Sequence, residues 1–280
     1  MNIQLPPLLQ PGDTIALCAT ARFAEPEHLE SARRHIEAAG FRCFVDPAIA
    51  VQHDQVAGTL SERVATFNRL LHDPGLKALW NVRGGYGSAE IVDLVDWDYF
   101  REHPKWLVGF SDFTTFLCHG QSQGVATLHA PMPVTFDRTV AGCLEATFHT
   151  LTSGEQHAKK WLPQQWSGRV VAGNLSVVYS ILGTPSLPHL DGAILVLEDL
   201  DEYHYHLDRM LLSMRRRGAF NSLVGVVLGE FSDIHDHAIA WGPSVAETLE
   251  KHFSALGVPV VQRTCIGHGA ENWPVLLTTC

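Results

Sequence analysis

The feature that most constrains the fold of this chain is an alternation between short apolar runs and stretches with helical periodicity. Residues 14–18 form an apolar run, and apolar side chains then recur at helical spacing through residues 27–39. Two further apolar runs, at residues 78–82 and 106–110, each end abruptly at a polar or glycine-rich turn. Such alternation is typical of a mainly parallel sheet flanked by helices, so we predict an α/β fold.

Local signals predict further elements. Thr59 is followed three residues later by Glu62, a capping-box pattern that predicts a helix over residues 60–71. Gly40 supplies a C-terminal stop for the helix over residues 27–39. The remaining predictions are strands at residues 42–45, 193–197 and 223–228, and helices near residues 175–182, 206–216 and 244–256.

A change in composition divides the chain. Its 280 residues suit one large domain or two smaller ones. The segment over residues 156–169 is polar and rich in lysine, glutamine and tryptophan, and we interpret it as a connection. The predicted domains are therefore residues 1–155 and residues 170–280.

The charge balance and the distribution of apolar residues exclude several classes of protein. There are 30 acidic and 20 basic residues, and a net charge of -10 argues against nucleic acid as a partner. The sequence begins without a basic segment followed by an apolar run, and no stretch approaches the ~20 apolar residues of a membrane helix. We therefore expect a cytoplasmic protein without a membrane partner. Six cysteines without a C-x-x-C pair predict reduced thiols.

Ser111 follows the apolar run at 106–110 and begins a helical pattern. A serine at such a strand end exposes its hydroxyl near free backbone N–H groups that can stabilise an oxyanion. Phe113 stands where the hydrolase elbow G-x-S-x-G has its second glycine, so the ordinary α/β-hydrolase assignment fails. Ser111 could instead cap a helix over residues 112–119, with Asp112 near the positive end of the helix dipole, and locally that role is the commoner one.

The turn over residues 83–87, Arg-Gly-Gly-Tyr-Gly, follows the apolar run at 78–82. In a parallel sheet this turn and Ser111 are expected on the same rim, at the carboxyl ends of the strands. The turn suits a second oxyanion donor, a phosphate cradle or simply a tight connection from strand to helix. Its spacing is neither G-x-G-x-x-G nor a P-loop, and no lysine follows.

Four further motifs follow these two in order along the chain, and with them the sequence resembles the LD-carboxypeptidase family over residues 11–274. The four motifs are Gly173-Asn-Leu, Leu197-Glu-Asp, Tyr205-His-Leu-Asp-Arg-Met-Leu and Gly267-His. The resemblance implies a Rossmann-like N-terminal parallel-sheet domain and a smaller α/β, β-rich C-terminal domain.

The resemblance also implies a catalytic triad of Ser111, Glu198 and His268. A histidine that takes the proton makes serine a nucleophile, and a carboxylate fixes the tautomer of the histidine. By the same resemblance the backbone amides of Gly85 and Asp112 form the oxyanion hole, and no metal or cofactor is needed. We also expect four residues to contact the substrate: Arg83, Gly84, Tyr86 and Asn174.

Other roles stay open for some of these residues. Glu198 could be a solvated strand end or an ion-pair partner of Arg209, since most carboxylates are surface groups. His268 is one of 16 histidines, so its identity alone carries little weight. Two H-x-H pairs, His204 with His206 and His235 with His237, suggest zinc ligands, but no cysteine or spaced carboxylate set completes a site, and we predict no metal.

Two departures from the family pattern bear on the site. Residues 271–277 stand where the family has a leucine- and proline-rich strand, and the short segment after His268 predicts looser support for that histidine. Ala130 replaces a glycine of the family, which would alter the backbone if a positive φ were needed there.

The function implied by the resemblance is a carboxypeptidase that releases D-alanine from a murein tetrapeptide. An alternative is a microcin-type hydrolase of aminoacyl nucleotides, for which Trp161 and Trp166 offer a stacking surface, although tryptophans in a connection more often pack a domain junction. A catalytically inactive ligand-binding relative is the third possibility. We expect a small peptide or muropeptide as substrate and allow for a homodimer.

Overall fold

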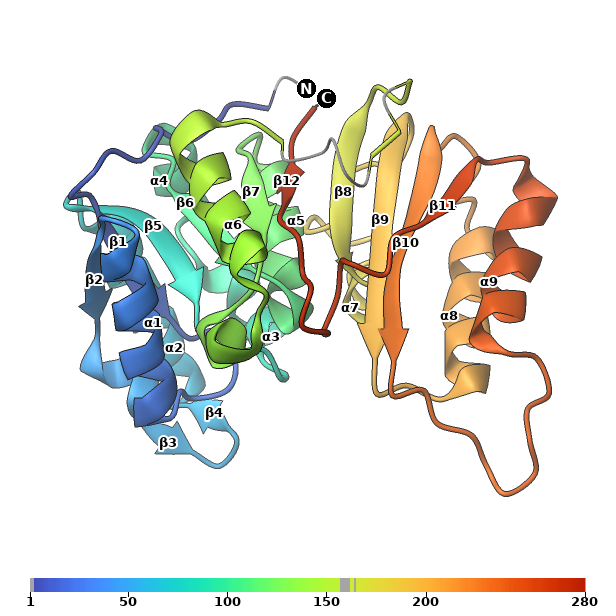
Figure 1. The fold of residues 1–280 in the computed structure, drawn as a ribbon, viewed down its shortest axis with the longest axis horizontal. Helices are drawn as coiled ribbons and strands as arrows, with labels where there is room; N and C mark the ends of the chain where they lie inside the picture. Colours follow the sequence, from blue (N-terminus) through green and yellow to red (C-terminus); the bar gives the residue numbers. More distant parts are fainter. Residues whose placement is uncertain (1–2, 157–161, 164, 280) are drawn as a thin grey trace.

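The computed structural model describes residues 3–156, 162–163 and 165–279. Figure 1 shows two α/β units side by side, each built on its own sheet. The described segments nearest to the two ends of the chain lie close together at one edge of the molecule, next to the junction between the units.

The N-terminal unit is built on a six-stranded sheet with the order β12-β7-β6-β5-β1-β2. All neighbouring strands are parallel except β12, which is antiparallel to β7. Helices α1 and α6 cover one face and α2 and α5 the other. The strands are β1 (Thr14–Cys18), β2 (Arg42–Val45), β5 (Leu76–Asn81), β6 (Trp106–Gly109), β7 (Thr127–His129) and β12 (Val275–Leu277), with a separate hairpin of β3 (Gln52–His53) and β4 (Val56–Ala57). The helices are α1 (Pro26–Ala38), α2 (Leu60–His72), α3 (Ser88–Ile91), α4 (Trp97–Glu102), α5 (Thr114–Ser122) and α6 (Ala141–Ser153).

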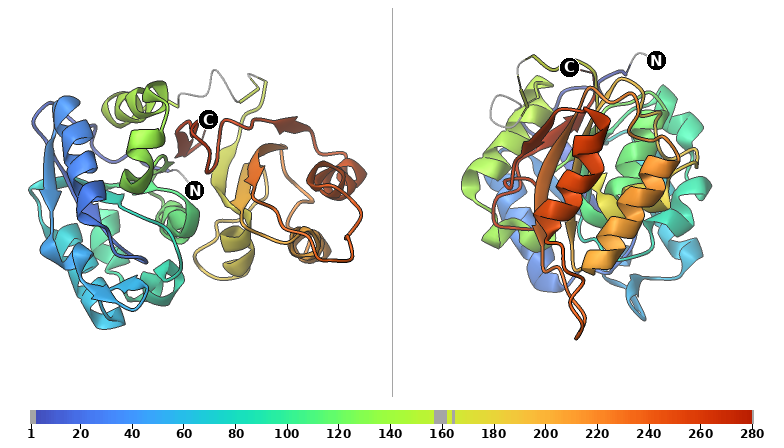
Figure 2. Two further views of the ribbon diagram at one scale, coloured as in Figure 1. Left: turned by 60° about the horizontal axis from the view of Figure 1, so that its bottom comes forward. Right: turned by 90° about the vertical axis from the view of Figure 1, so that its right-hand side faces the viewer.

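The C-terminal unit has a four-stranded parallel sheet with the order β11-β10-β9-β8. Figure 2 shows α8 and α9 next to each other over its outer face, and α7 lies on the inner face near α5. The elements are β8 (Arg169–Asn174), α7 (Leu175–Ser180), β9 (Ala193–Leu200), α8 (His204–Arg216), β10 (Gly225–Ser232), α9 (Val245–Phe253) and β11 (Val260–Gln262). The predicted fold class, an N-terminal parallel sheet with a smaller C-terminal α/β unit, is confirmed.

Short 3-10 turns complete the chain. They span Pro47–Ala50, Val92–Leu94, Ser111–Phe113, Pro133–Arg138 and Ser254–Leu256.

The capping box before α2 is present, because the Glu62 N–H donates to Thr59 Oγ1 at 3.4 Å and the Thr59 N–H donates to Glu62 Oε2 at 2.8 Å. Among the described helices none is both long and apolar enough to cross a membrane.

The last strand, β12, returns to the N-terminal sheet. Val275 pairs with His129 of β7, and the Val170 N–H at the start of β8 donates to Thr278 O at 2.8 Å. Figure 1 shows β12 between the two sheets. The sequence analysis places all of residues 170–280 in the second domain and does not predict that β12 joins the sheet of the first. The proposed connection over 156–169 includes residues 157–161 and 164, which lie outside the described residues.

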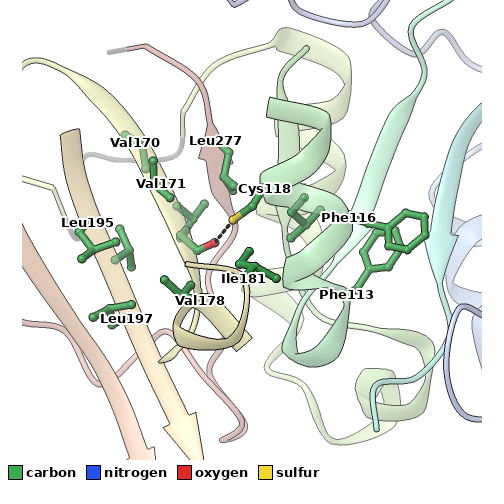
Figure 3. Packing of buried hydrophobic residues seen from close by; sticks show 14 of the residues in the cluster. Phe113, Phe116, Cys118, Val170, Val171, Val178, Ile181, Leu195, Leu197 and Leu277 are labelled. Atoms are coloured by element: carbon green, nitrogen blue, oxygen red, sulfur yellow. Dashed lines mark hydrogen bonds between the residues drawn. The ribbon is translucent and has the colours of Figure 1, made fainter. Parts of the chain in front are cut away.

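A shared apolar core joins the two units. Phe116 and Cys118 of α5 are buried against Val170 and Val171 of β8 and Leu277 of β12, as Figure 3 shows. The Cys118 thiol lies 3.9 Å from the carbonyl oxygen of Ala172. Burying this surface fixes the orientation of one sheet relative to the other, which matters because each unit carries part of the site described below.

Strand β8 approaches α5 so closely that only glycine fits at position 173. A Cβ built on Gly173 would lie 2.1 Å from Thr114 Cγ2, and the Asn174 N–H donates to Thr114 Oγ1 at 3.1 Å. Because overpacking forces neighbouring groups apart, we expect Gly173→Ala to lower the free energy of unfolding by about 1–3 kcal/mol. Urea unfolding measures this change.

Gly142 provides the matched control for that substitution. It lies in the first turn of α6, and a Cβ there would meet Trp273 at an ordinary 3.4 Å. Gly142→Ala is expected to keep or raise stability, because alanine favours the helix. A Gly173→Ala protein as stable as the wild type would show that β8 and α5 are less tightly packed than described.

Candidate active site

Ser111 lies on a strained turn between β6 and α5. Its φ is 59°, one of four positive values among the described residues that are not glycine. Gly109, at the end of β6, has a φ of 157°, and a Cβ on it would lie 2.8 Å from Phe113 Cδ1. A serine held in the left-handed region at a strand-to-helix turn is the geometry of a nucleophile elbow, although the second glycine of the usual motif is absent.

Helix capping does not explain this serine. Within the part of the chain that the structure describes, no backbone N–H donates to Ser111 Oγ, and the turn over Ser111–Phe113 has no side-chain cap. Asp112 instead accepts a hydrogen bond from the Ser88 N–H at 2.9 Å, at the start of α3. Burial raises the pKa of the Asp112 carboxyl, and hydrogen bonds from Ser88 and Gly87 oppose that rise. The elbow is thus tied to the glycine-rich turn before α3.

The two sequence motifs meet at Ser111, as the sheet topology predicts. A Cβ built on Gly84 would lie 2.8 Å from Ser111 Oγ and 3.6 Å from the Asp112 amide nitrogen. Gly85 is exposed and has a φ of 116°. Among the described residues, nothing accepts a hydrogen bond from the amides of Gly85 or Asp112. Both N–H groups are therefore available to an oxyanion next to Ser111.

The other residues expected to contact substrate differ in their settings. Arg83 is half-buried, whereas the Tyr86 side chain is 71% exposed beside the glycine-rich turn. Asn174 is buried, its Nδ2 donates to Asp199 Oδ1 at 2.7 Å, and its Oδ1 accepts from the Val177 N–H at 3.2 Å. The Asn174 side chain therefore caps α7 and holds Asp199, and both of its polar atoms have protein partners.

Glu198 and His268 form a buried pair. Glu198 is 1% exposed near the end of β9, and its Oε2 lies 2.7 Å from His268 Nδ1. Both alternative roles of Glu198 are wrong. Its side chain is buried and so is not a solvated strand end. The Arg209 guanidinium lies over the Tyr205 ring and does not pair with Glu198. Because a carboxylate only accepts, Nδ1 carries the proton and Nε2 of the neutral ring is left as an acceptor.

His268 lies next to the elbow. Its ring packs on Phe110, the residue before Ser111, with ring centroids 4.7 Å apart. Burial favours the neutral ring, but the Glu198 carboxylate and its hydrogen bond outweigh this and raise the pKa of His268. Next to this pair, burial and the Glu198 charge raise the pKa of Asp199 to about 7. The second unit thus places the imidazole of His268 against Phe110, the residue that precedes Ser111.

Three of the four paired histidines of the second unit contact acids or aromatic rings. His206 Nδ1 lies 2.5 Å from Glu202 Oε2, and His235 Nε2 lies 2.6 Å from Asp201 Oδ1. His237 stacks on Tyr203 with ring centroids 4.7 Å apart. The described residues contain no group of three or more His, Cys, Asp or Glu side chains arranged to hold a metal ion.

Sequence reasoning missed three polar residues around His268. Glu230 accepts a hydrogen bond from the Gly269 N–H, and Asn272 accepts one from the Gly267 N–H. His129 Nε2 in turn lies 3.2 Å from Asn272 Oδ1. One signal was available for Glu230, which like Glu198 follows the apolar part of a parallel strand. Ala130 has no positive φ, so its replacement of glycine does not distort the backbone.

The closeness of Gly84 to Ser111 gives a test of the geometry. We expect Gly84→Ala to lower kcat about 10- to 100-fold, because the new methyl group would displace Ser111 Oγ from its position. Steady-state kinetics with any hydrolysed substrate measures this, and Gly142→Ala again serves as control. Unchanged kcat in Gly84→Ala would mean that the turn and the elbow are farther apart than described.

The two α/β units thus carry an elbow serine in the first and a buried Glu–His pair in the second, an arrangement that fits a serine peptidase. Residues 15–130 match the LD-carboxypeptidase N-terminal domain, and residues 167–279 match the LD-carboxypeptidase C-terminal domain. The chain belongs to the LD-carboxypeptidase family.

Similar proteins cover most of the chain. It is 30% identical to a probable murein peptide carboxypeptidase of Bacillus subtilis, over 94% of this chain and 86% of the relative. It is 29% identical to the murein tetrapeptide carboxypeptidase of Pseudomonas aeruginosa, over 95% and 92%. A crystal structure of the muramoyltetrapeptide carboxypeptidase from Oxalobacter formigenes superposes with a TM-score of 0.83 at 25% identity, over 95% of this chain and 92% of the other. The microcin self-immunity protein MccF shares the fold, with a TM-score of 0.81 at 18% identity over 98% of both chains.

Proposed function

We propose that this protein is a serine carboxypeptidase that hydrolyses an L,D-amide bond and releases the C-terminal D-alanine of a murein tetrapeptide in the cytoplasm. The observation that carries the proposal is the buried hydrogen bond between Glu198 and His268, held against the elbow of Ser111 by the Phe110 ring. The names of the relatives from Bacillus subtilis and Pseudomonas aeruginosa support a murein peptide as the substrate class.

The proposed reaction begins with attack of Ser111 Oγ on the carbonyl carbon of the L-residue. His268 Nε2 accepts the hydroxyl proton as the C–O bond forms, and Glu198 stabilises the imidazolium through Nδ1–H. The charge that develops on the carbonyl oxygen is stabilised by the free amides of Gly85 and Asp112.

Collapse of the tetrahedral intermediate breaks the C–N bond. His268 returns its proton to the nitrogen of the leaving D-alanine, and an ester of Ser111 remains. Water then attacks this ester with His268 as base, which releases the shortened peptide and restores the Ser111 hydroxyl. Arg83, Gly84 and Tyr86 are proposed to contact the substrate, while Asn174 contributes by supporting the end of β9.

Mass spectrometry of a murein tetrapeptide incubated with the protein tests this function. Release of D-alanine is expected, and the matching peptide with a terminal L-alanine should be cleaved far more slowly. A fluorophosphonate probe should label Ser111, since the serine oxygen displaces fluoride from phosphorus. Absence of labelling in the wild type would refute the serine mechanism.

Hydrolysis of an acylated nucleotide in place of the tetrapeptide would redirect the substrate assignment. No contact of the described tryptophans favours that alternative. Trp166 packs against Gly225 of β10, where a Cβ would lie 2.4 Å from its ring, so it serves the interior of the second unit. Trp161 lies outside the described residues.

A further inference from the structure

His268 lies in a part of the chain that has no regular secondary structure. Residues 263–274, between β11 and β12, form neither strand nor helix. Backbone ladders therefore do not fix the position of the imidazole, and the N–H groups of Gly267 and Gly269, on either side of it, bond to side chains. A base displaced by about 1 Å from its nucleophile can lose as much as 100-fold in rate, so whatever holds this turn controls the reaction.

We propose that Glu230 and Asn272 are positioning residues that hold the peptide groups on the two sides of His268, and that Asn272 is itself anchored by His129 of the sheet that carries Ser111. This inference rests on the proposed function, because it assumes that His268 acts on Ser111. Neither side chain is assigned a contact with substrate.

Glu230 holds the turn from β10. Its Oε2 accepts a hydrogen bond from the Gly269 N–H at 2.5 Å, and its own N–H donates to Ile266 O at 2.7 Å. A Cβ on Gly267 would lie 2.8 Å from Glu230 Cβ, and a Cβ on Gly269 would lie 2.7 Å from Glu230 Oε2. The glycines that flank His268 therefore let the turn lie directly against this glutamate.

Asn272 holds the other side of the turn. Its Oδ1 accepts from the Gly267 N–H at 3.2 Å, and His129 Nε2 lies at the same distance from that oxygen. Turning the amide over would place its NH₂ group against the Gly267 N–H, so the orientation is fixed. Since Oδ1 only accepts, His129 Nε2 carries a proton. Burial lowers the pKa of His129, which favours the neutral form of the ring.

His129 connects Asn272 to the N-terminal sheet. It is the last residue of β7, which is a neighbour of the strand that leads to Ser111. The Phe110 ring contacts both histidines, with centroids 5.6 Å from His129 and 4.7 Å from His268. The chain His129–Asn272–Gly267 and the Phe110 ring thus set the separation of His268 from Ser111 across the junction of the two units.

The rate at which a fluorophosphonate labels Ser111 tests the inference on the full chain without knowledge of the substrate. Glu230→Ala and Asn272→Ala should each label at least 10-fold more slowly than the wild type. Glu230→Gln should keep at least a third of the wild-type rate, because its amide oxygen can still accept from the Gly269 N–H. The pH midpoint of labelling in Glu230→Ala should stay unchanged, since the charges that act on His268 are Glu198, Asp199 and Arg138.

Glu247→Ala is the matched control. Glu247 also accepts a backbone N–H, that of Ser244 in the capping box of α9, and lies outside the site. It should lower the melting temperature without slowing the labelling of Ser111. This separates loss of stability from loss of position.

Each outcome has a definite meaning. Labelling of Glu230→Ala or of folded Asn272→Ala at the wild-type rate, or labelling of Glu230→Gln as slow as that of Glu230→Ala, would overturn the inference while leaving the proposed function intact. A wild type that is not labelled at all would overturn the proposed function instead. If Asn272→Ala does not fold, the comparison of the two Glu230 variants still decides.

Discussion

Replacement of Ser111 by alanine is expected to lower kcat by on the order of 10⁴-fold or more, with little change in substrate affinity or stability. The expected loss is large because, in the proposed mechanism, Ser111 Oγ forms the covalent bond on which the later steps depend. The free amides of Gly85 and Asp112 remain in the variant, so a small rate above that of water should persist. Rates of D-alanine release by wild type and variant measure the effect.

Ser180 supplies the control for this substitution. It is an exposed serine on α7 whose hydroxyl donates to Val177 O, and Ser180→Ala should leave kcat unchanged. Far-UV circular dichroism should show that Ser111→Ala is folded. Alanine at position 111 keeps the positive φ of 59°, so the substitution does not relieve the backbone strain of the elbow. More than a tenth of wild-type turnover in Ser111→Ala would exclude the covalent route.

The sequence predicted those elements whose signals are local. The apolar runs at residues 14–18 and 42–45 coincide with β1 and β2, and Thr59 with Glu62 marks the start of α2. The rim on which Gly84 and Ser111 meet followed from parallel topology alone. In each case the information lies within a few residues or in a general rule of chain geometry.

Pairings between distant segments were not predictable in this way. Val275–Leu277 is a short apolar run that would suit either sheet, and only the tertiary structure places it beside β7. The expected looseness behind His268 was based on the length of this segment, whereas the structure places buried Asn272 there, bonded to His129. Such a contact spans 143 positions and leaves no pattern in a single sequence.

The elbow shows why local and distant evidence had to be combined. From the sequence near Ser111, helix capping was the commoner explanation, and the absence of a second glycine weakened the nucleophile. The positive φ of Ser111 reverses this, because a cap residue has an extended backbone and a bonded side-chain oxygen, and Ser111 has neither. Strain at a residue other than glycine is visible only in three dimensions.

Replacement of Glu198 by glutamine is expected to lower kcat by on the order of 10²- to 10⁴-fold and to move the acid limb of the pH profile to lower pH. The carboxylate fixes the tautomer of His268 and stabilises the imidazolium, and an amide does neither reliably. In the proposed mechanism the neutral imidazole is the base, so kcat/KM of the wild type should fall as the pH drops through the pKa of His268. Glu198 raises that pKa, and the pKa should therefore fall when the charge is removed.

Profiles of kcat/KM against pH for wild type, Glu198→Gln and Glu250→Gln measure both effects. Glu250 is an exposed residue of α9, and its variant should reproduce the wild-type profile. The direction of the shift is the decisive observation, because a variant that merely packed badly would lose rate at every pH without moving the midpoint. An acid limb that stays in place or moves to higher pH would mean that the group titrating in catalysis is not the imidazole paired with Glu198.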